Sequence, residues 1–366
     1  MTFLYERCIR PALFLFSPDR VHLMALRIGK LFSFPPFAWL FRLIYHYEHP
    51  ALKQELLGLT FSNPIGLSAG FDKDGEIPSA IRAVGFGFEE VGSVTAEPYA
   101  GNTPPWATRL VQDEGLIVNY GLKNKGAAAL RKRLRRPYPL VLGVSVAKTN
   151  KRFASEREMI DDWTRGIAAV QGCGDYLTIN LSCPNTHDPC TFQDPRLLEK
   201  LLAAVAKLHI QEPVFLKVGP DNDEQTIKRI IAVAKRHSYV KGFIISNLAK
   251  DRSKLSLKTP KSVFAHRPGG VSGPVMKSRA LTTLRLFRKH SHGRFIFIGC
   301  GGISSAEDAY EYIEAGASLV QLITGMIFHG PGLIKEIKKG LVRLLERDGL
   351  SHISEVVRKE KKSTMP

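Results

Sequence analysis

The sequence predicts a (β/α)8 barrel of the TIM type as a single catalytic domain over residues 51–350. Short apolar runs alternate with amphipathic helical stretches from Asn63 onward, and polar or glycine residues cluster where these runs end. We also expect an amphipathic two-helix extension at residues 1–50 and a polar, basic tail at residues 351–366.

Eight apolar runs are rich in Val, Ile, Leu and Phe, which is typical of parallel strands covered on both faces. The predicted strands are Ile65–Ala69, Glu89–Val94, Val141–Ala147, Tyr176–Ser182, Val214–Val218, Gly242–Asn247, Phe295–Cys300 and Leu319–Thr324. Between the last two, Ser304 and Glu307 predict a capping box that begins a helix. A doubly wound open sheet is the alternative, but an open sheet built from eight evenly sized strand–helix units would be unusually wide.

The composition fits a globular protein with free thiols and an anionic partner. Apolar residues make up 44% of the 366 residues, and the five cysteines match no zinc-binding spacing, so no metal site is expected. The net charge of +18 suits a lipid surface, a nucleic acid or acidic metabolites. Two basic clusters are also compatible with solvated faces: Arg131, Lys132, Arg133, Arg135 and Arg136, and Lys359, Lys361 and Lys362.

The first 50 residues combine aromatic and basic side chains. Ser17, Pro18 and Asp19 predict the start of one helix, and a second is expected from Phe37 to Tyr47. No uncharged apolar run reaches the ~18–20 residues needed to span a bilayer. We therefore expect these helices to lie in the plane of a membrane interface, the alternative being that they simply pack on the barrel.

Polar residues at the ends of the predicted strands mark the candidate site, because barrel enzymes carry their chemistry there. Glycines follow the seventh run at Gly299–Gly302, and Thr324-Gly325 follows the eighth. The loops after these strands are the usual phosphate site of the fold, although a structural turn is the other reading.

Several of these segments resemble the class 2, quinone-linked dihydroorotate dehydrogenases. The resemblance rests on Asn63-Pro64-Ile65-Gly66-Leu67-Ser68-Ala69-Gly70-Phe71-Asp72-Lys73, Asn180-Leu181-Ser182-Cys183-Pro184-Asn185-Thr186, Gly269-Gly270-Val271-Ser272-Gly273, Val320-Gln321-Leu322 and Ser17-Pro18-Asp19-Arg20-Val21-His22. It covers nearly the whole chain. It implies FMN as cofactor, oxidation of dihydroorotate to orotate in pyrimidine biosynthesis, and transfer of electrons to a membrane quinone.

The resemblance also implies roles for individual residues. Cys183 corresponds to the base that takes the C5 proton while a hydride goes to the flavin; most class 2 members have serine there. Lys73 acts with it, and Lys73, Asn180, Asn185 and Asn247 correspond to the contacts with the anionic pyrimidine. The residues expected to hold FMN are Ala69, Gly70, Lys73, Ser93, Ser145, Asn180, Lys217, Ser246, Gly273, Gly301, Gly302, Ile323 and Thr324.

The same resemblance places His22 and Arg109 at the mouth of a quinone tunnel between the N-terminal helices and the barrel. Each residue also has a structural reading, as a helix-surface histidine or an arginine paired with an acid. The implied location is peripheral, at the cytoplasmic face of the inner or cell membrane. No nucleic acid partner is expected, because a dihydrouridine synthase-like enzyme acting on tRNA would normally need a separate RNA-binding domain.

The sequence departs from the family inside the expected substrate pocket. Val118 stands where the family has an asparagine, with Asn119 one residue later, and Leu248 replaces a hydroxyl residue. Ser145 replaces an asparagine near FMN, and Ile323 replaces a tyrosine. The loop Thr186–Cys190 departs as well. Two alternatives therefore remain: a paralogous FMN oxidoreductase with another small cyclic substrate, or an inactive flavin-binding membrane protein.

Overall fold

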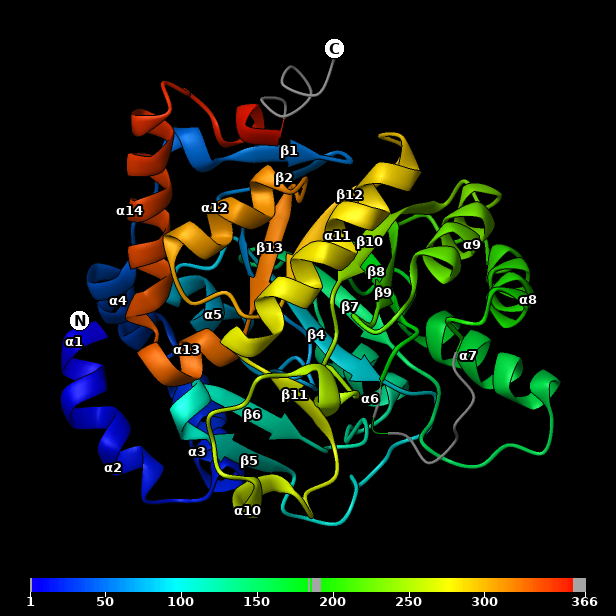
Figure 1. Cartoon of the computed structure of the whole chain (residues 1–366), viewed down its shortest axis with the longest axis horizontal. Coiled ribbons are helices and arrows are strands. Elements are labelled where there is room, and N and C mark those ends of the chain that lie inside the picture. The colour runs from blue at the N-terminus through cyan, green and yellow to red at the C-terminus, as the bar shows by residue number, and fades with distance from the viewer. Residues whose placement is uncertain (1, 184, 186–191, 358–366) are drawn as a thin grey trace.

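The computed structural model describes residues 2–183, 185 and 192–357, and eight parallel strands form a closed barrel at its centre (Figure 1). Around the barrel the strands follow the order β10-β12-β13-β3-β4-β7-β8-β9. Their bounds are β3 Ile65–Leu67, β4 Phe88–Val94, β7 Val141–Val146, β8 Tyr176–Asn180, β9 Val214–Val218, β10 Val240–Ile245, β12 Ile296–Cys300 and β13 Leu319–Leu322. All eight predicted strands are confirmed.

Helices cover the outside of the barrel, and this explains why the strands are apolar on both faces. All seven residues of β4 are buried, as are all five of β9. The covering helices are α5 Pro78–Val84, α6 Ala127–Arg133, α7 Glu156–Val170, α8 Pro195–Ala206, α9 Glu224–Lys235, α11 Lys277–Ser291, α12 Ala306–Glu314, α13 Thr324–His329 and α14 Gly332–Arg347. The capping box predicted at Ser304 and Glu307 was one residue off: the Ser305 hydroxyl accepts from the Asp308 N–H at 3.1 Å.

Two antiparallel additions close the ends of the barrel. A hairpin of β1 Gln54–Leu56 and β2 Leu59–Phe61 packs on the aromatic cluster that fills the N-terminal end. At the other end, β5 Ala107–Leu110, β6 Gly115–Val118 and β11 Gly270–Ser272 form a three-stranded sheet that the sequence analysis did not predict. This small sheet covers the end at which the polar strand termini gather.

The N-terminal part is helical throughout and lies against one side of the barrel (Figure 1). Helix α3, Pro18–Leu31, begins where predicted, with the Ser17 hydroxyl accepting from the Arg20 N–H at 3.4 Å. Helix α4 spans Pro35–Tyr45. Three earlier helical turns were not predicted from the sequence: α1 Thr2–Leu4, the π-helical turn Tyr5–Ile9 and α2 Arg10–Phe14. Among the described helices, none is both long and apolar enough to cross a membrane.

Beyond α14, the described chain continues to residue 357. Ile353 and Val356 in this stretch are buried against the barrel. Lys359, Lys361 and Lys362 of the predicted basic tail lie outside the described residues, as do Thr186–Cys190 of the divergent loop.

Candidate functional site

A cavity of about 620 Å³ opens at the C-terminal end of the barrel strands and continues between the barrel and the N-terminal helices. It brings together almost every residue that the sequence analysis selected. Those that line it are His22, Ala69, Gly70, Lys73, Ser93, Arg109, Asn180, Cys183, Asn185, Lys217, Ser246, Asn247, Gly273, Gly301, Gly302, Ile323 and Thr324. Ser145 alone of the expected set does not reach the cavity; it is fully buried behind Ser93, with 2.7 Å between their hydroxyl oxygens.

Cys183 follows β8 and has the only thiol among the residues expected to act on substrate. Burial raises the pKa of this thiol to about 11, although the Asn185 backbone and the charge of Lys148 act in the opposite direction. The thiol is therefore protonated near neutral pH. Because it must lose its proton to act as a base, the thiolate is a minor species there.

Three asparagines line the cavity with Cys183, and two of them, Asn180 and Asn247, are hydrogen-bonded to each other. The Asn180 amide donates to the Ser93 hydroxyl at 2.9 Å, and the Asn247 amide donates to the Asn180 side-chain oxygen at 3.0 Å. The Asn185 amide donates to the Val118 carbonyl at 2.8 Å, whereas its side-chain oxygen is buried and has no hydrogen-bond partner among the described residues. An unpaired buried acceptor at a cavity wall suits a ligand N–H group.

Two lysines approach the cavity from different strands. Lys217 on β9 donates to the Ser68 hydroxyl at 2.9 Å and lies 3.5 Å from Glu90 in a buried ion pair. Lys73 follows β3, donates to the Gly70 carbonyl at 2.6 Å and places its ammonium 4.0 Å from the centre of the Tyr120 ring. Burial lowers the pKa of Lys73 to about 8. Lys73 is thus a cation at pH 7 and loses its charge within the mildly alkaline range.

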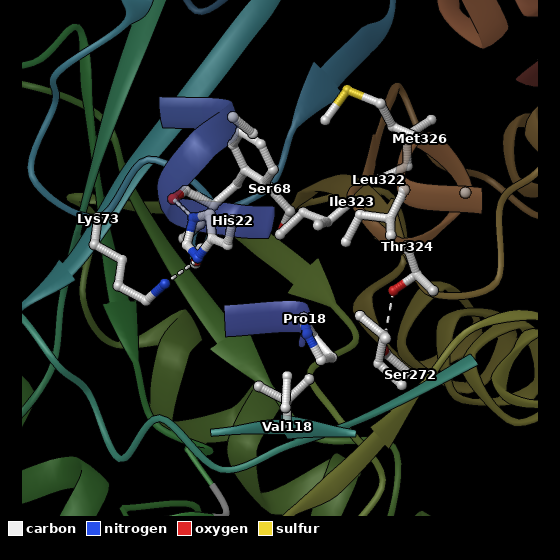
Figure 2. Close-up of a pocket in the computed structure, with 18 of the residues that line it drawn as sticks. Pro18, His22, Ser68, Lys73, Val118, Ser272, Leu322, Ile323, Thr324 and Met326 are labelled. Atoms are coloured by element: carbon white, nitrogen blue, oxygen red, sulfur yellow. Dashed lines mark hydrogen bonds between the residues drawn. The ribbon is translucent and has the colours of Figure 1, made fainter. Parts of the chain in front are cut away.

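The cavity wall contains glycines whose backbone conformation excludes most other residues. Gly70, Gly273, Gly301 and Gly302 have φ values of +117°, +113°, +128° and +70°. A Cβ added at Gly302 would lie 2.9 Å from the Lys277 Cβ, and one at Gly273 would lie 2.7 Å from the Gly115 Cα. Exposed backbone of this kind after β12 can approach the oxygens of a phosphate closely. The Thr324 and Ser272 hydroxyls, 2.8 Å apart on the same wall, add donors there (Figure 2).

Three of the residues that depart from the family pattern, Val118, Leu248 and Ile323, are part of the cavity wall. Val118 and Leu248 both line the cavity. Asn119 does not replace the missing contact, because its side-chain oxygen accepts from the Asn102 amide at 3.0 Å and the residue is absent from the cavity wall. The cavity therefore has apolar side chains at two positions, Val118 and Leu248, where the resemblance implies polar contacts with the substrate.

A hydrogen-bonded group joins helix α3 to the barrel near Lys73. His22 Nε2 lies 2.8 Å from the Phe71 carbonyl, and His22 Nδ1 lies 3.2 Å from the Tyr120 hydroxyl. Burial, followed by the nearby Lys73, lowers the pKa of His22 to about 3, so the imidazole is neutral. Because a carbonyl only accepts, Nε2 carries the hydrogen and Nδ1 is the acceptor.

Two partners in this group were missed from the sequence. The Tyr120 hydroxyl also lies 3.3 Å from an Asp19 carboxylate oxygen, and the other Asp19 oxygen accepts from the Trp106 N–H at 3.0 Å. Asp19 was read only as an acid in the first turn of a helix. Tyr120 stands two residues after Val118, and only the unpredicted strand β6 places both side chains on the cavity.

Arg109 on β5 lies at the far side of the same cavity. Its guanidinium donates to the Phe16 carbonyl at 2.7 Å and sits 4.2 Å from the centre of the Phe14 ring. Its Nε is buried without a partner among the described residues. Around it the passage is mainly apolar, with Leu13, Val21, Ala25 and Ile28 in its wall.

An eight-stranded parallel barrel with a polar, glycine-rich cavity at the strand ends defines a β/α-barrel enzyme. Comparison with known proteins identifies which one: a family model described as dihydroorotate dehydrogenase matches residues 51–345. The chain belongs to the dihydroorotate dehydrogenase family, whose members are generally flavin-dependent oxidoreductases.

Relatives named dihydroorotate dehydrogenase (quinone) match over most of the chain. A protein of Sulfurovum sp. (strain NBC37-1) is 34% identical, with 98% of this chain and 99% of the relative covered. One from Sphingopyxis alaskensis is 42% identical over 84% of this chain and 86% of its own. The solved dihydroorotate dehydrogenase of Eimeria tenella, in complex with ferulenol, superposes with a TM-score of 0.82 at 29% identity, covering 93% of this chain and 94% of that one. These matches place the chain with the class 2 members of the family.

Proposed function

We propose that the protein oxidises dihydroorotate to orotate with FMN as cofactor and passes the electrons to a membrane quinone. The observation that carries this proposal is one continuous cavity, which joins the pocket of Cys183 and Lys73 to an apolar passage along helix α3. A polar substrate and an apolar acceptor can thus reach the same cofactor from different ends.

The cavity wall has the groups that FMN requires. Gly273, Gly301 and Gly302 have positive φ values that expose their backbone at the cavity wall, and the hydroxyls of Ser272 and Thr324 lie on the same wall, which suits the phosphate. Lys217 and Asn180 lie deeper in the barrel, where they would hold the ring. When bound, FMN supplies the acceptor for a hydride and the route of the electrons to quinone.

The chain's own residues would then position the substrate and move its proton. Lys73 supplies positive charge for the anionic substrate, and the free oxygen of Asn185 accepts from a ring N–H. Cys183, once deprotonated, takes the proton from C5 while the hydride leaves C6. The side chains of Asn180 and Asn247 are hydrogen-bonded to each other, and Asn180 also donates to Ser93. These two asparagines would therefore both maintain the shape of the pocket and contact the substrate.

The exposed apolar side chains of the N-terminal helices suit peripheral attachment to a membrane surface, at the cytoplasmic face of the inner or cell membrane. Phe3, Phe16, Trp39 and Leu43 are all more than half exposed. Side chains of this kind, with cations among them, bind in the interfacial layer of a bilayer. The quinone would enter between α3, α4 and the barrel, past His22 and Arg109.

A substitution that blocks the apolar passage should separate the two half-reactions, because only quinone reduction uses this passage. Ala25 lines the passage on α3, whereas Leu23 on the same helix is 49% exposed. We expect Ala25→Trp to slow quinone reduction by at least about tenfold, because the larger side chain obstructs the passage. Reduction of the bound flavin by dihydroorotate should be unchanged. Leu23→Trp is the matched control. Equal quinone turnover in Ala25→Trp and wild type would refute the route.

A second candidate function is favoured by Val118 and Leu248. Two apolar walls reduce the complementarity to dihydroorotate, since an unpaired buried polar group of a ligand costs about 1–3 kcal/mol. The candidate is an FMN oxidoreductase acting on a related cyclic amide with alkyl groups at these two positions. A purified, yellow protein whose flavin is reduced by such an amide but not by dihydroorotate would establish it.

A further inference from the structure

The segment between β10 and β11 is strongly basic. Residues 250–268 contain six lysines and arginines but one acid, Asp251. Arg252 is used inside the segment, where its guanidinium donates to the carbonyls of Phe264, Arg267 and Gly269. Four cations have exposed side chains and take part in no ion pair in the described part of the chain: Lys250, Lys258, Lys261 and Arg267.

The turn between β5 and β6 connects this segment to the N-terminal helices. The Asp113 carboxylate, in the turn Val111–Asp113 between β5 and β6, accepts from the backbone N–H groups of Lys258 and Thr259 at 2.7 and 2.9 Å. The next residue, Glu114, lies 3.7 Å from Arg10. In Figure 1 the β5–β6 sheet and the short helix α10, Lys261–Phe264, occupy the same lower part of the view as α2 and α3.

The apolar surface of the N-terminal helices continues onto this segment. Within the described residues, 17 large apolar side chains are exposed, and 14 of them lie in residues 1–50. Two of the remaining three are Val111, 57% exposed in the β5–β6 turn, and Val263, 41% exposed in α10. Exposed apolar side chains thus concentrate on the N-terminal helices and on this one further edge, where the free cations also lie.

A cluster of basic residues can also have a purely structural role, as the arginines in and after helix α6 show. In α6, Arg131 donates to the carbonyls of Ala169 and Gln171 and Arg133 binds Glu76, and just beyond the helix Arg136 binds Asp175. These cations connect neighbouring elements of the fold. The cations of residues 250–268 differ because they project from an exposed edge that also carries apolar side chains.

We propose that residues 250–268 form a second membrane-contact element that binds anionic phospholipid headgroups beside the N-terminal helices. The proposal rests on the membrane attachment proposed above and adds a lipid preference to it. Apolar side chains of the N-terminal helices, Val111 and Val263 would enter the interfacial layer, while Lys258, Lys261 and Arg267 meet the phosphates. The passage to the cofactor would then be held against the bilayer from two sides.

Vesicle co-sedimentation of the flavin-loaded, full-length protein tests this. The probes are phosphatidylcholine vesicles with and without phosphatidylglycerol. The variant Lys258→Gln/Lys261→Gln/Arg267→Gln is compared with Lys207→Gln/Lys241→Gln/Arg229→Gln, which removes equal charge from exposed positions directly after α8, on β10 and on α9. We expect the first variant to bind anionic vesicles about 100-fold more weakly, which is the fold-change that corresponds to about 1 kcal/mol for each of its three cations. The second variant should bind like wild type.

The loss should disappear at high salt and on vesicles without phosphatidylglycerol. Flavin content and thermal midpoint should match wild type in both variants, since neither alters the cavity wall. Equal weakening in both variants, or none in either, would overturn the inference while leaving the proposed function intact. Wild-type protein that binds neither kind of vesicle would overturn both. Unchanged vesicle binding together with lost binding of single-stranded RNA would assign the segment to nucleic acid instead.

Discussion

The raised pKa of Cys183 leads to a quantitative prediction about how the reaction depends on pH. With a thiol pKa of about 11, roughly one molecule in 10,000 carries the thiolate at pH 7. Each pH unit upward multiplies that fraction by about ten. If the thiolate is the base, the limiting rate of flavin reduction at saturating dihydroorotate should rise about a thousandfold between pH 6.5 and pH 9.5.

The same pH series distinguishes the effect of Cys183 on the rate from the effect of Lys73 on substrate affinity. Because the pKa of Lys73 is about 8, its charge is present below that pH and is lost above it, so the affinity for an anionic substrate should fall as the pH rises. Rapid-mixing absorbance at the flavin band, measured over a range of substrate concentrations at each pH, yields the rate and the dissociation constant independently. A limiting rate that is flat across this range would refute the assignment of Cys183, and so would Cys183→Ala with wild-type rates.

Three further predictions concern other parts of the molecule. Both carboxylate oxygens of Glu89 are buried without partners among the described residues, and burial raises the pKa of this carboxyl group. Because a raised pKa makes the native state less stable as the pH rises, Glu89→Leu should stabilise the protein by about 1–3 kcal/mol at pH 7. The gain should be smaller at pH 4, and urea titrations at the two pH values measure both. Val118→Asn with Leu248→Thr should tighten orotate about 10- to 100-fold in flavin difference spectra, since two hydrogen bonds are added; weaker binding would contradict this. Tyr120→Phe removes the partner of His22 Nδ1, so it should change the ¹⁵N shifts of that imidazole and slow quinone reduction only.

The barrel could be predicted because its signal repeats. The strands are largely buried on both faces, so their sequences are mostly apolar, and eight such runs occur with polar residues at the same end. The strand-end positions then converge without any knowledge of side-chain contacts, which is why Lys73, Cys183, Lys217 and Asn247 were all found to line one cavity.

The three-stranded sheet over the cavity could not be predicted in the same way. Its strands have three or four residues each, and β11 pairs with β6 across more than 150 positions of sequence, so no local pattern marks them. Tyr120 and Asp19 were missed for this reason, because they meet only through that sheet and helix α3. Ser145 was expected to help hold FMN, but it does not line the cavity, because it is buried behind Ser93.

Residues 2–14 were missed for a different physical reason. Their helical turns are short and include a π-helical turn, and their stability comes from contacts with the far end of the chain. The Tyr5 hydroxyl donates to the Ile327 carbonyl at 2.8 Å, and His329 lies 2.6 Å from Glu6. Such contacts between distant segments leave no periodic signal in the sequence.

The most direct test is anaerobic reduction of the purified, flavin-bound protein by dihydroorotate, with Cys183→Ala as the control. The account predicts that the flavin absorbance bleaches within the time of turnover, that one equivalent of orotate forms per flavin, and that the alanine variant retains bound flavin but is not reduced. Flavin that stays oxidised in the wild-type protein would contradict the account, and it would identify Val118 and Leu248 as the walls of a pocket for another substrate.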